Sequence, residues 1–544
     1  MPVISYGFVT LGTFGTRSCK IHGLSTFTIG KRSYADLGRI PYNLLYVSEH
    51  EKPKFFDMIL YNFHKARLLV EKQLIHHVEP GFVPDLEKSK LEQQVKEVMT
   101  TLDLHDAILD VCFPFRRDDG AHELIYGYKA HYKSNRTPLR GAIRFSMDVT
   151  RDKIMALSTL SSFTNAFAKI PFGGSSGGLR IQPNDYNDNE LRRITHKFVV
   201  EMYRKGFMAP SIDICAPEKG TRQREMSWIA DFYNRTYGYG DIYASTCVTG
   251  KTLATGGLEG FKSGAADGLF MCLDKFINNK HFMEKISVTP GWKNKTYVMQ
   301  GCGYIGTKII KHLCRAGAKL IGIQTTRGSI INKNGIDGTD IVLYRKRTGT
   351  IVGYKDADPY PVAKNILEEP CDILILAATE QVITNVIAPS LNAKIILEAS
   401  NGPITPAADR HLLGKNVLII PDILANCGGP AVSYMEWQNT MQPIVNMRLR
   451  FKRNSDILFL KSVEEALNRQ DYNLKITPLS DVLREVQGIR QKELTYAGLQ
   501  FLTERSFAKV MKLVEQFDLG IDIRTAAYVG AIKRVFKDVY NYIY

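Results

Sequence analysis

Residues 138–181 read PLRGAIRFSMDVTRDKIMALSTLSSFTNAFAKIPFGGSSGGLRI, which places a strand pattern, a helix pattern and a glycine cluster in direct succession. Residues 141–145 are typical of a strand. Residues 152–162 are typical of a helix, because apolar side chains recur at a spacing of three and Asp152 lies in the first turn. A short apolar strand then leads through Lys169 and Phe172 into GGSSGG.

The glycine cluster at residues 173–178 allows two interpretations. Glycine adopts a positive φ at no steric cost and lets a backbone approach a ligand closely, so the cluster predicts a turn at a binding site. Glycine clusters are equally typical of flexible surface turns. Both interpretations expect a turn at this point of the chain.

Length and composition indicate a globular protein with two or more domains, because the chain has 544 residues, 44% of them hydrophobic and 23% charged. No apolar run reaches the length of a membrane span. The net charge of +16 suits anionic ligands, but there is no dense Lys/Arg run, so we expect no nucleic-acid partner. The nine cysteines lack CxxC spacing, which predicts neither a metal site nor a disulfide framework.

The N-terminal residues 1–45 are expected to form a mitochondrial transit peptide and leader. Residues 1–35 contain no Asp or Glu, whereas Arg17, Lys20, Lys31 and Arg32 make them basic, and hydroxyl residues are frequent. This composition is typical of transit peptides and predicts a location in the mitochondrial matrix. A disordered basic tail would have a similar composition.

Two α/β regions follow the leader. Residues 46–243 mix helices and strands, including a helix capped by Asn187 and closed by Gly206. The apolar face of this helix carries Leu191, Ile194, Phe198 and Met202. Residues 244–445 alternate short apolar strands with helices, as in a parallel sheet. The strands expected there are 296–300, 319–323, 372–377, 395–398 and 417–420.

Two helical segments end the chain. Residues 446–494 are charged and mostly helical, and they predict a polar helical insertion. Residues 495–544 close with a helix at 525–543, in which apolar side chains recur at helical spacing. We expect this last helix to pack between the two α/β domains.

The sequence QGCGYIG at residues 300–306 carries G-x-G-x-x-G spacing between an expected strand and an expected helix. Gly301 would permit the tight turn, Gly303 would let a pyrophosphate approach the backbone, and Gly306 would let the helix pack on the strand. Amides at the start of the helix would face the phosphates. We therefore predict an α/β fold with an N-terminal α/β substrate domain, a Rossmann-type dinucleotide-binding domain and a helical insertion, and NAD or NADP as the cofactor.

The segment at 138–181 resembles the substrate-binding block of the animal mitochondrial glutamate dehydrogenases, which reads roughly GGIRYS, then a lysine, then PFGGAKAG. Further blocks follow in the same order, so the resemblance covers about residues 54–541. They are RTP at 136–138, PSIDICAPE at 210–218, REMSWIAD at 224–231, CVTGK at 247–251, ASNGPITP at 399–406, CGGPAVSYMEW at 427–437 and RTAAYV at 524–529. The resemblance implies a homohexamer with an antenna at 446–494 and a pivot at 495–544.

Three lysines of the family fall on other residue types here. The lysine that binds the substrate side-chain carboxylate falls on Arg140, the lysine for the α-carboxylate on Thr164, and the catalytic lysine on Ser176. An arginine still binds a carboxylate, but Thr164 is neutral and Ser176 cannot exchange protons near pH 7 as a lysine does. Asp213 matches the catalytic aspartate and Ser433 a substrate-contacting serine. On sequence alone, each could also be an ordinary structural polar residue, Asp213 as a loop or capping aspartate.

The cofactor site departs from the family in a similar way. The family's ribose-binding glutamate falls on Thr325, with Arg327 close by, while Asn401 and Asn426 are placed near the nicotinamide and its ribose. Without a carboxylate, two interpretations remain: a preference for the 2′-phosphate of NADP, or a weakened affinity for any dinucleotide. Further family contacts are replaced at Phe261, Ala265 and Asp267.

The resemblance implies NAD(P)-dependent oxidative deamination of L-glutamate to 2-oxoglutarate and ammonia. Because catalytic lysines are replaced, we expect reduced activity. Lys169, five residues after Thr164, is the one neighbouring lysine that could replace a lost family lysine. Strand alternation leaves open whether its side chain points into the cleft or away from it. The alternative is a catalytically impaired paralogue with a structural or regulatory role, which mixes into hexamers with an active relative.

Overall fold

The computed structural model describes residues 40–77, 88–361, 364–441, 458–469, 475–476 and 491–544. All of them belong to one unit, Arg39–Tyr544. Residues 1–39 of the expected transit peptide and leader, and most of the expected antenna, lie outside the described residues. Within the antenna, residues 458–468 are helical, as the sequence predicted.

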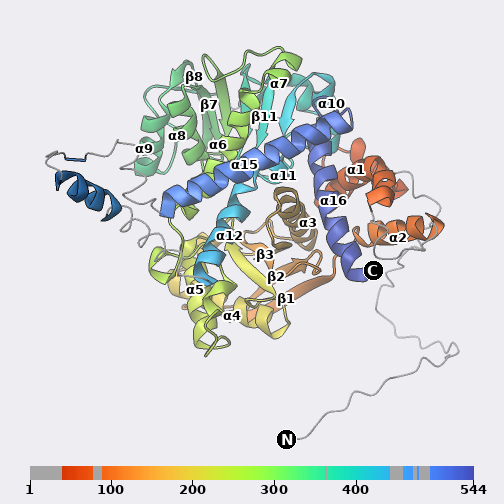
Figure 1. Ribbon diagram of the computed structural model, residues 1–544, viewed down its shortest axis with the longest axis vertical. Helices are drawn as coiled ribbons and strands as arrows, with labels where there is room; N and C mark the ends of the chain where they lie inside the picture. Colours follow the sequence, from red (N-terminus) through yellow and green to blue (C-terminus); the bar gives the residue numbers. More distant parts are fainter. Residues whose placement is uncertain (1–39, 78–87, 362–363, 442–457, 470–474, 477–490) are drawn as a thin grey trace, which may run out of the picture. The chain divides into compact units, whose positions relative to one another are not determined.

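The first sheet has five strands in the order β1-β2-β4-β3-β5. The strands are β1 (Ala107–Arg116), β2 (His122–His131), β3 (Leu139–Phe145), β4 (Gly173–Leu179) and β5 (Asp213–Pro217). β1, β2 and β4 pair antiparallel, whereas β4, β3 and β5 pair parallel. Helices α3 (Arg151–Ala168), α4 (Asp188–Arg204) and α5 (Gln223–Arg235) accompany this sheet (Figure 1).

The expected turn at the glycine cluster is wrong, because these residues form β4 in the middle of the sheet. Every residue of β4 is buried, and none of its glycines has a positive φ. The glycines are needed for close packing instead. A Cβ at Gly174 would lie 2.2 Å from Ser162 N on α3, and a Cβ at Gly178 would lie 2.4 Å from Arg144 O on β3.

Helix α3 is longer than the sequence predicted. It continues through Ala168 and ends at Lys169, which is an exposed residue in the left-handed conformation (φ 57°). Lys169 is therefore a helix cap and does not lie on a strand. Thr150 begins the helix, and its side chain accepts a hydrogen bond from Lys153 N.

Helix α4 confirms the expected cap and the expected face. Asn187 and Glu190 form a reciprocal capping box at its N-terminus, and Gly206 follows its end with φ 74°. The predicted apolar residues Leu191, Ile194, Phe198 and Met202 are all buried.

The second sheet has seven strands in the order β12-β11-β10-β6-β7-β8-β9, of which the first five pair parallel. The strands are β6 (Thr296–Gln300), β7 (Lys319–Thr325), β8 (Gly328–Ile336), β9 (Asp358–Pro359), β10 (Ile373–Leu376), β11 (Ile395–Glu398) and β12 (Leu418–Ile420). All five expected strands are present. The antiparallel strand β8 was not predicted from the sequence, because polar residues and Gly335 interrupt its apolar pattern.

The other helices connect and surround the two sheets. They are α1 (Phe55–His77), α2 (Lys88–Thr101), α6 (Phe261–Ile277), α7 (Lys280–Lys285), α8 (Tyr304–Ala316), α9 (Gly338–Thr348), α10 (Pro406–Gly414), α11 (Asp422–Ala425), α12 (Gly428–Met441), α15 (Gln491–Gln516) and α16 (Ile523–Ile543). Helix α16 packs against α1, α3 and α15 (Figure 1). None of the described helices is both long and apolar enough to cross a membrane.

Candidate active site

Strand register brings Arg140 and Ser176 to one face of the first sheet. Arg140 on β3 lies opposite Gly174 on β4, and Ala142 lies opposite Ser176. Because side chains alternate along a strand, Arg140 and Ser176 share a face. Helix α3 covers this face, since a Cβ at Gly174 would meet the backbone of α3. The buried Thr164 belongs to the same helix.

Asp213 lies on the opposite face, in a cluster of buried polar side chains. Lys129 Nζ and His131 Nε2 on β2 are each 2.8 Å from Asp213 Oδ2. Ser175 Oγ donates a hydrogen bond of 2.7 Å to Asp213 Oδ1. Burial would raise the pKa of Asp213, but the charge of Lys129 and the hydrogen bond from His131 hold this pKa below its ordinary value. The carboxylate is therefore charged, and protein groups occupy both of its oxygens.

The structure does not bring Asp213 together with Ser176. Asp213 bonds to Ser175, and the side chains of Ser175 and Ser176 point to opposite faces because the two residues are neighbours on one strand. In this arrangement a ligand on the α3 side meets Ser176 and Arg140, while the carboxylate of Asp213 lies beyond the sheet.

Arg140 is a half-buried cation whose hydrogen bonding is incomplete. Burial lowers the pKa of its guanidinium to about 10, while the negative charges of Glu218 and Asp213 raise this pKa. Among the described residues, Arg140 Nε has no hydrogen-bond partner. Arg140 remains charged at neutral pH and has a donor to offer, so it is a candidate for binding a substrate carboxylate.

Ser176 and Ser433 also have buried hydroxyls to which the described part of the chain offers no hydrogen-bond partner. Ser433 lies on α12, where its neighbour Val432 packs in an apolar cluster with Phe172, the residue before β4. Hydroxyl groups can donate a hydrogen bond to a polar ligand, but they carry no charge at neutral pH.

The glycine-rich turn after β6 has the geometry of a phosphate-binding turn. Gly301 has φ 91°, and a Cβ there would lie 2.5 Å from Ala377 O, so only glycine fits. A Cβ at Gly306 would lie 2.3 Å from Gly301 O. Gly303 precedes the first residue of α8 and has open space around its Cβ position, so a phosphate could approach the free amides of the helix.

The other three predicted cofactor residues follow strands of the second sheet. Thr325 is the last residue of β7, and its hydroxyl donates to Gly328 O at 3.1 Å. Asn401 follows β11, and Asn426 follows the short helix after β12. Asn426 Nδ2 is 3.5 Å from Ser400 O. Thr325 lies at the carboxyl end of a parallel strand and the two asparagines lie beyond such ends, where dinucleotides bind in sheets of this type.

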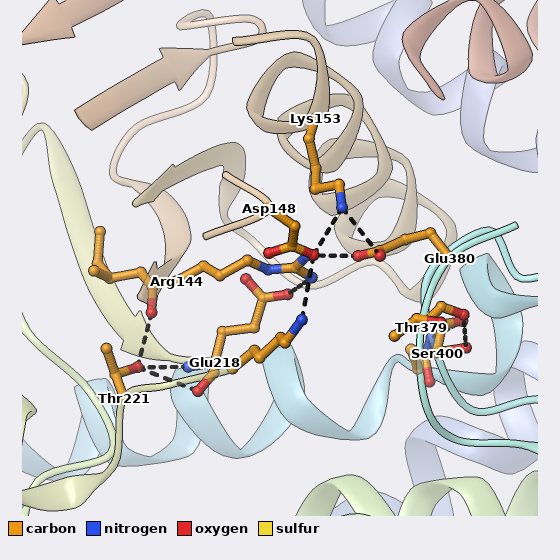
Figure 2. Close-up of polar contacts among 11 residues, drawn as sticks. Arg144, Asp148, Lys153, Glu218, Thr221, Thr379, Glu380 and Ser400 are labelled. Atoms are coloured by element: carbon orange, nitrogen blue, oxygen red, sulfur yellow. Dashed lines mark hydrogen bonds and ion pairs between the residues drawn. The ribbon is translucent and has the colours of Figure 1, made fainter. Parts of the chain in front are cut away.

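A network of ion pairs, which the sequence did not predict, joins the two sheets (Figure 2). Glu380, in the loop after β10, binds Arg144 Nη1 at 2.6 Å through Oε1 and Lys153 Nζ at 3.3 Å through Oε2. Arg144 Nη2 also binds Glu218 at 2.6 Å, and Lys153 binds Asp148 at 2.9 Å. Burial would raise the pKa of Glu380, but Arg144 and Lys153 hold it below its ordinary value.

Sequence reasoning missed these residues and the cluster around Asp213 for different reasons. Lys129 and His131 gave a usable signal, because these two titratable residues follow Ile125 and Gly127 on the buried face of β2. Glu380 gave no local signal, because its partners lie more than 200 residues away in the chain.

Two family models match the chain. The model described as Glu/Leu/Phe/Val dehydrogenase, dimerisation domain, matches residues 105–235. The model described as Glutamate/Leucine/Phenylalanine/Valine dehydrogenase matches residues 256–473.

Similar curated proteins and solved structures extend this result to most of the chain. The mitochondrial glutamate dehydrogenase of Dictyostelium discoideum is 31% identical over 94% of this chain and 97% of its own length. The NADP-specific glutamate dehydrogenase A1 of Halobacterium salinarum is 33% identical over 64% of this chain and 80% of its own. Crystallised hetero-hexameric glutamate dehydrogenase from Thermus thermophilus, in its Leu bound form, shares the fold with a TM-score of 0.68 and 23% identity over 90% of this chain and 97% of its own.

Proposed function

This chain belongs to the glutamate dehydrogenase family. We propose that it binds NAD or NADP together with glutamate or 2-oxoglutarate, and that it converts glutamate and 2-oxoglutarate into each other slowly. One observation carries this proposal: the α3 face of the first sheet combines the half-buried cation Arg140 with the neutral Ser176, and α3 itself carries the neutral Thr164. Such a site can hold one carboxylate firmly, but it lacks the charges that grip a second carboxylate and move protons.

The size of the expected loss of activity on glutamate follows from general values for each missing interaction. A general acid–base group contributes roughly 10²- to 10⁴-fold to a rate. A charge-assisted hydrogen bond to a carboxylate contributes roughly 1.5 to 3 kcal/mol. If both are missing and their effects add, activity on glutamate is lower than in an ordinary relative by about 10⁴-fold or more.

A second candidate function is a structural or regulatory role in a mixed hexamer. The state of Asp213 favours it, because a buried carboxylate bound by Lys129 and Ser175 is poorly placed for chemistry on the α3 side of the sheet. Hetero-hexamers occur in the family, since the Thermus thermophilus protein is described as one. Co-expression with an active relative, followed by mass analysis of purified hexamers, tests this role.

We also propose a domain organisation and a mitochondrial location for this chain. Residues 46–243 form the substrate domain, 244–445 the dinucleotide domain, 446–494 the antenna and 495–544 the pivot and C-terminal helices of a homohexamer. Residues 1–45 direct the chain to the mitochondrial matrix. The basic residues 1–35, which contain no Asp or Glu, and the mitochondrial Dictyostelium relative support this location. Fusion of residues 1–45 to a fluorescent protein tests it.

The sharpest test of the catalytic proposal restores the missing ammonium groups. The double variant Thr164→Lys with Ser176→Lys should gain activity on glutamate by at least 100-fold, measured as dinucleotide reduction at 340 nm. Thr164→Ser with Ser176→Ala is the matched control, because it changes the same positions without adding charge. Both variants must keep the melting temperature within a few degrees of the parent. A folded double-lysine variant without any gain would contradict the proposal.

A further inference from the structure

The carboxyl end of β11 is held by a buried arginine of the C-terminal helix α16. Arg524 Nη2 donates a hydrogen bond of 2.7 Å to Glu398 Oε1, and Arg524 Nη1 donates one of 2.9 Å to Glu398 Oε2. Glu398 is the last residue of β11, and both side chains are buried. Two parallel N–H donors fix both the position and the plane of a carboxylate. The end of β11 is therefore held in one orientation relative to α16.

The short helix α11 starts at the same carboxylate. The backbone N of Asp422, the first residue of α11, donates a hydrogen bond of 2.9 Å to Glu398 Oε2. Asn426, one of the two asparagines expected near the nicotinamide and its ribose, follows the last residue of α11, and its backbone N donates to Asp422 O at 2.8 Å. Because α11 is about one helical turn closed by this bond, the position of Asp422 determines the position of Asn426.

The other asparagine, Asn401, lies between two residues that are held from different sides. Gly402 N donates a hydrogen bond of 2.8 Å to Asp422 Oδ2. Ser400 Oγ donates one of 3.2 Å to Thr379 O, in the loop after β10 (Figure 2). The backbone on both sides of Asn401 is therefore fixed, and one of its two supports is the same Asp422 that precedes Asn426.

Arg524 has a further partner in the same cluster. Its Nε donates a hydrogen bond of 2.9 Å to Asp409 Oδ1, on α10. Asp409 is buried like the other two acids. It shares their cation, whereas the two asparagines are connected to Arg524 through Glu398 and Asp422. A change at Asp409 therefore perturbs the cluster from the side that does not carry the asparagines.

The next turn of α16 packs on α3, the helix that carries Thr164. Tyr528 is buried, and its ring lies edge to face with that of Phe163, the neighbour of Thr164, at a centroid distance of 5.6 Å. One helix thus contacts both the end of β11 and the substrate side of the molecule. A displacement of Arg524 would change where the two asparagines lie relative to α3.

We propose that Arg524 is a positioning residue, which holds Asn401 and Asn426 where they meet the nicotinamide end of a bound dinucleotide. This inference rests on the proposed dinucleotide-binding function and adds to it a buried residue of the C-terminal helix. The phosphates would bind at the glycine-rich turn after β6, and β10 separates β6 from β11. A displaced asparagine should therefore weaken contacts at the nicotinamide end alone. The contrary interpretation, that Arg524 only holds α16 in place, predicts a loss of stability without a selective loss of binding.

The test is calorimetric titration of the full chain with NADH and NADPH, and with ADP-ribose and its 2′-phosphate, which are the same molecules without the nicotinamide. Burial raises the pKa of Glu398 to about 7, so the titrations are made at pH 8, where this carboxylate is charged. Arg524→Lys keeps the charge but loses the paired donors. It should weaken the dinucleotide about tenfold, as the loss of one or two hydrogen bonds does, and leave the truncated ligand within about twofold.

Asp409→Asn is the matched control within the cluster. It should lower the melting temperature but change neither affinity, because Glu398 and Asp422 keep their bonds. Glu398→Gln is the second variant, which decides the question if Arg524→Lys does not fold. It retains the shape of the side chain without its charge and should show the same selective loss of dinucleotide binding.

The possible outcomes separate this inference from the function on which it rests. Unchanged dinucleotide affinity in a folded variant, an equal loss of dinucleotide and truncated ligand, or the same loss in Asp409→Asn would overturn the positioning role and leave dinucleotide binding intact. Failure of both Arg524→Lys and Glu398→Gln to fold would also overturn it, because the cluster would then serve folding alone. Binding of neither dinucleotide to the parent chain at millimolar concentration would overturn the proposed function as well.

Discussion

Lys129 and Asp213 form a fully buried ion pair. Both side chains are completely inaccessible to solvent, and His131 and Ser175 complete the hydrogen bonding of the carboxylate. Because the pKa of Asp213 is lowered in the folded state, its stabilising contribution is present above the unfolded carboxyl pKa of about 3.9 and is lost as the pH falls below that value. Asp213 is thus a structural group whatever its catalytic role.

Lys129→Met should destabilise the protein by about 3 to 5 kcal/mol, because it leaves the carboxylate of Asp213 buried without its cation. Chemical denaturation measures the loss. Lys205→Met is the matched control, since Lys205 forms an exposed pair with Glu201, and it should cost less than about 1 kcal/mol. Adding Asp213→Asn to Lys129→Met should recover part of the loss, and strict additivity of the two changes would contradict the coupling.

Strand β4 is buried in the middle of the first sheet although its sequence is rich in glycine. GGSSGG has the composition of a turn, but tertiary packing makes it a central strand, because α3 and β3 approach so closely that side chains are excluded. Elements with strong periodicity, such as α4 and the apolar strands of the second sheet, were predictable from sequence. The partners of Glu380 were not, since segments more than 200 residues away in the chain supply them.

Gly174→Ala should destabilise the protein by about 3 kcal/mol or more, because the new Cβ would lie 2.2 Å from the backbone of α3 and force the helix off the sheet. Gly414→Ala is the matched control. Gly414 is the last residue of α10, has no atom within 4 Å of its Cβ position and has no positive φ, so alanine should be neutral or slightly stabilising there. Equal melting temperatures for the two variants would contradict the packing argument.

The ion pairs of Glu380 connect the loop after β10 to β3 and α3 (Figure 2). Glu380→Gln should lower the melting temperature and increase hydrogen exchange in both β3 and the loop, because Arg144 and Lys153 lose a shared partner. Glu504→Gln, which breaks the exposed pair with Lys275, should change neither. Increased exchange confined to the loop would show that Glu380 does not connect the two sheets.

Arg524 connects helix α16 to the second sheet through a buried acidic cluster. Its guanidinium binds Glu398 at 2.7 and 2.9 Å and Asp409 at 2.9 Å, while Asp422 lies 4.0 Å away. Burial raises the pKa of Glu398 to about 7, with Asp422 adding to the rise and Arg524 opposing it. Because α16 also packs on α1 and α3, this cluster connects distant parts of the molecule.

The free energy of unfolding should fall as the pH rises from about 4.5 to 7, because Glu398 in the folded state then retains a proton that it has released in the unfolded state. The difference amounts to about 3 kcal/mol. Glu398→Gln should remove this dependence, seen as a smaller difference in melting temperature between pH 5 and pH 7. Glu201→Gln, on the surface, should leave the wild-type difference unchanged. Identical pH profiles for all three proteins would contradict the assignment.

The most direct measurement of the central claim is the initial rate of dinucleotide reduction at 340 nm by the purified protein with glutamate. It is compared under identical conditions with the mitochondrial relative from Dictyostelium discoideum. The neutral Thr164 and Ser176 predict a value of kcat/KM about 10⁴-fold lower, with saturating NADP⁺ or NAD⁺. A rate within tenfold of that relative would show that the chain performs the reaction without the ammonium groups we consider missing.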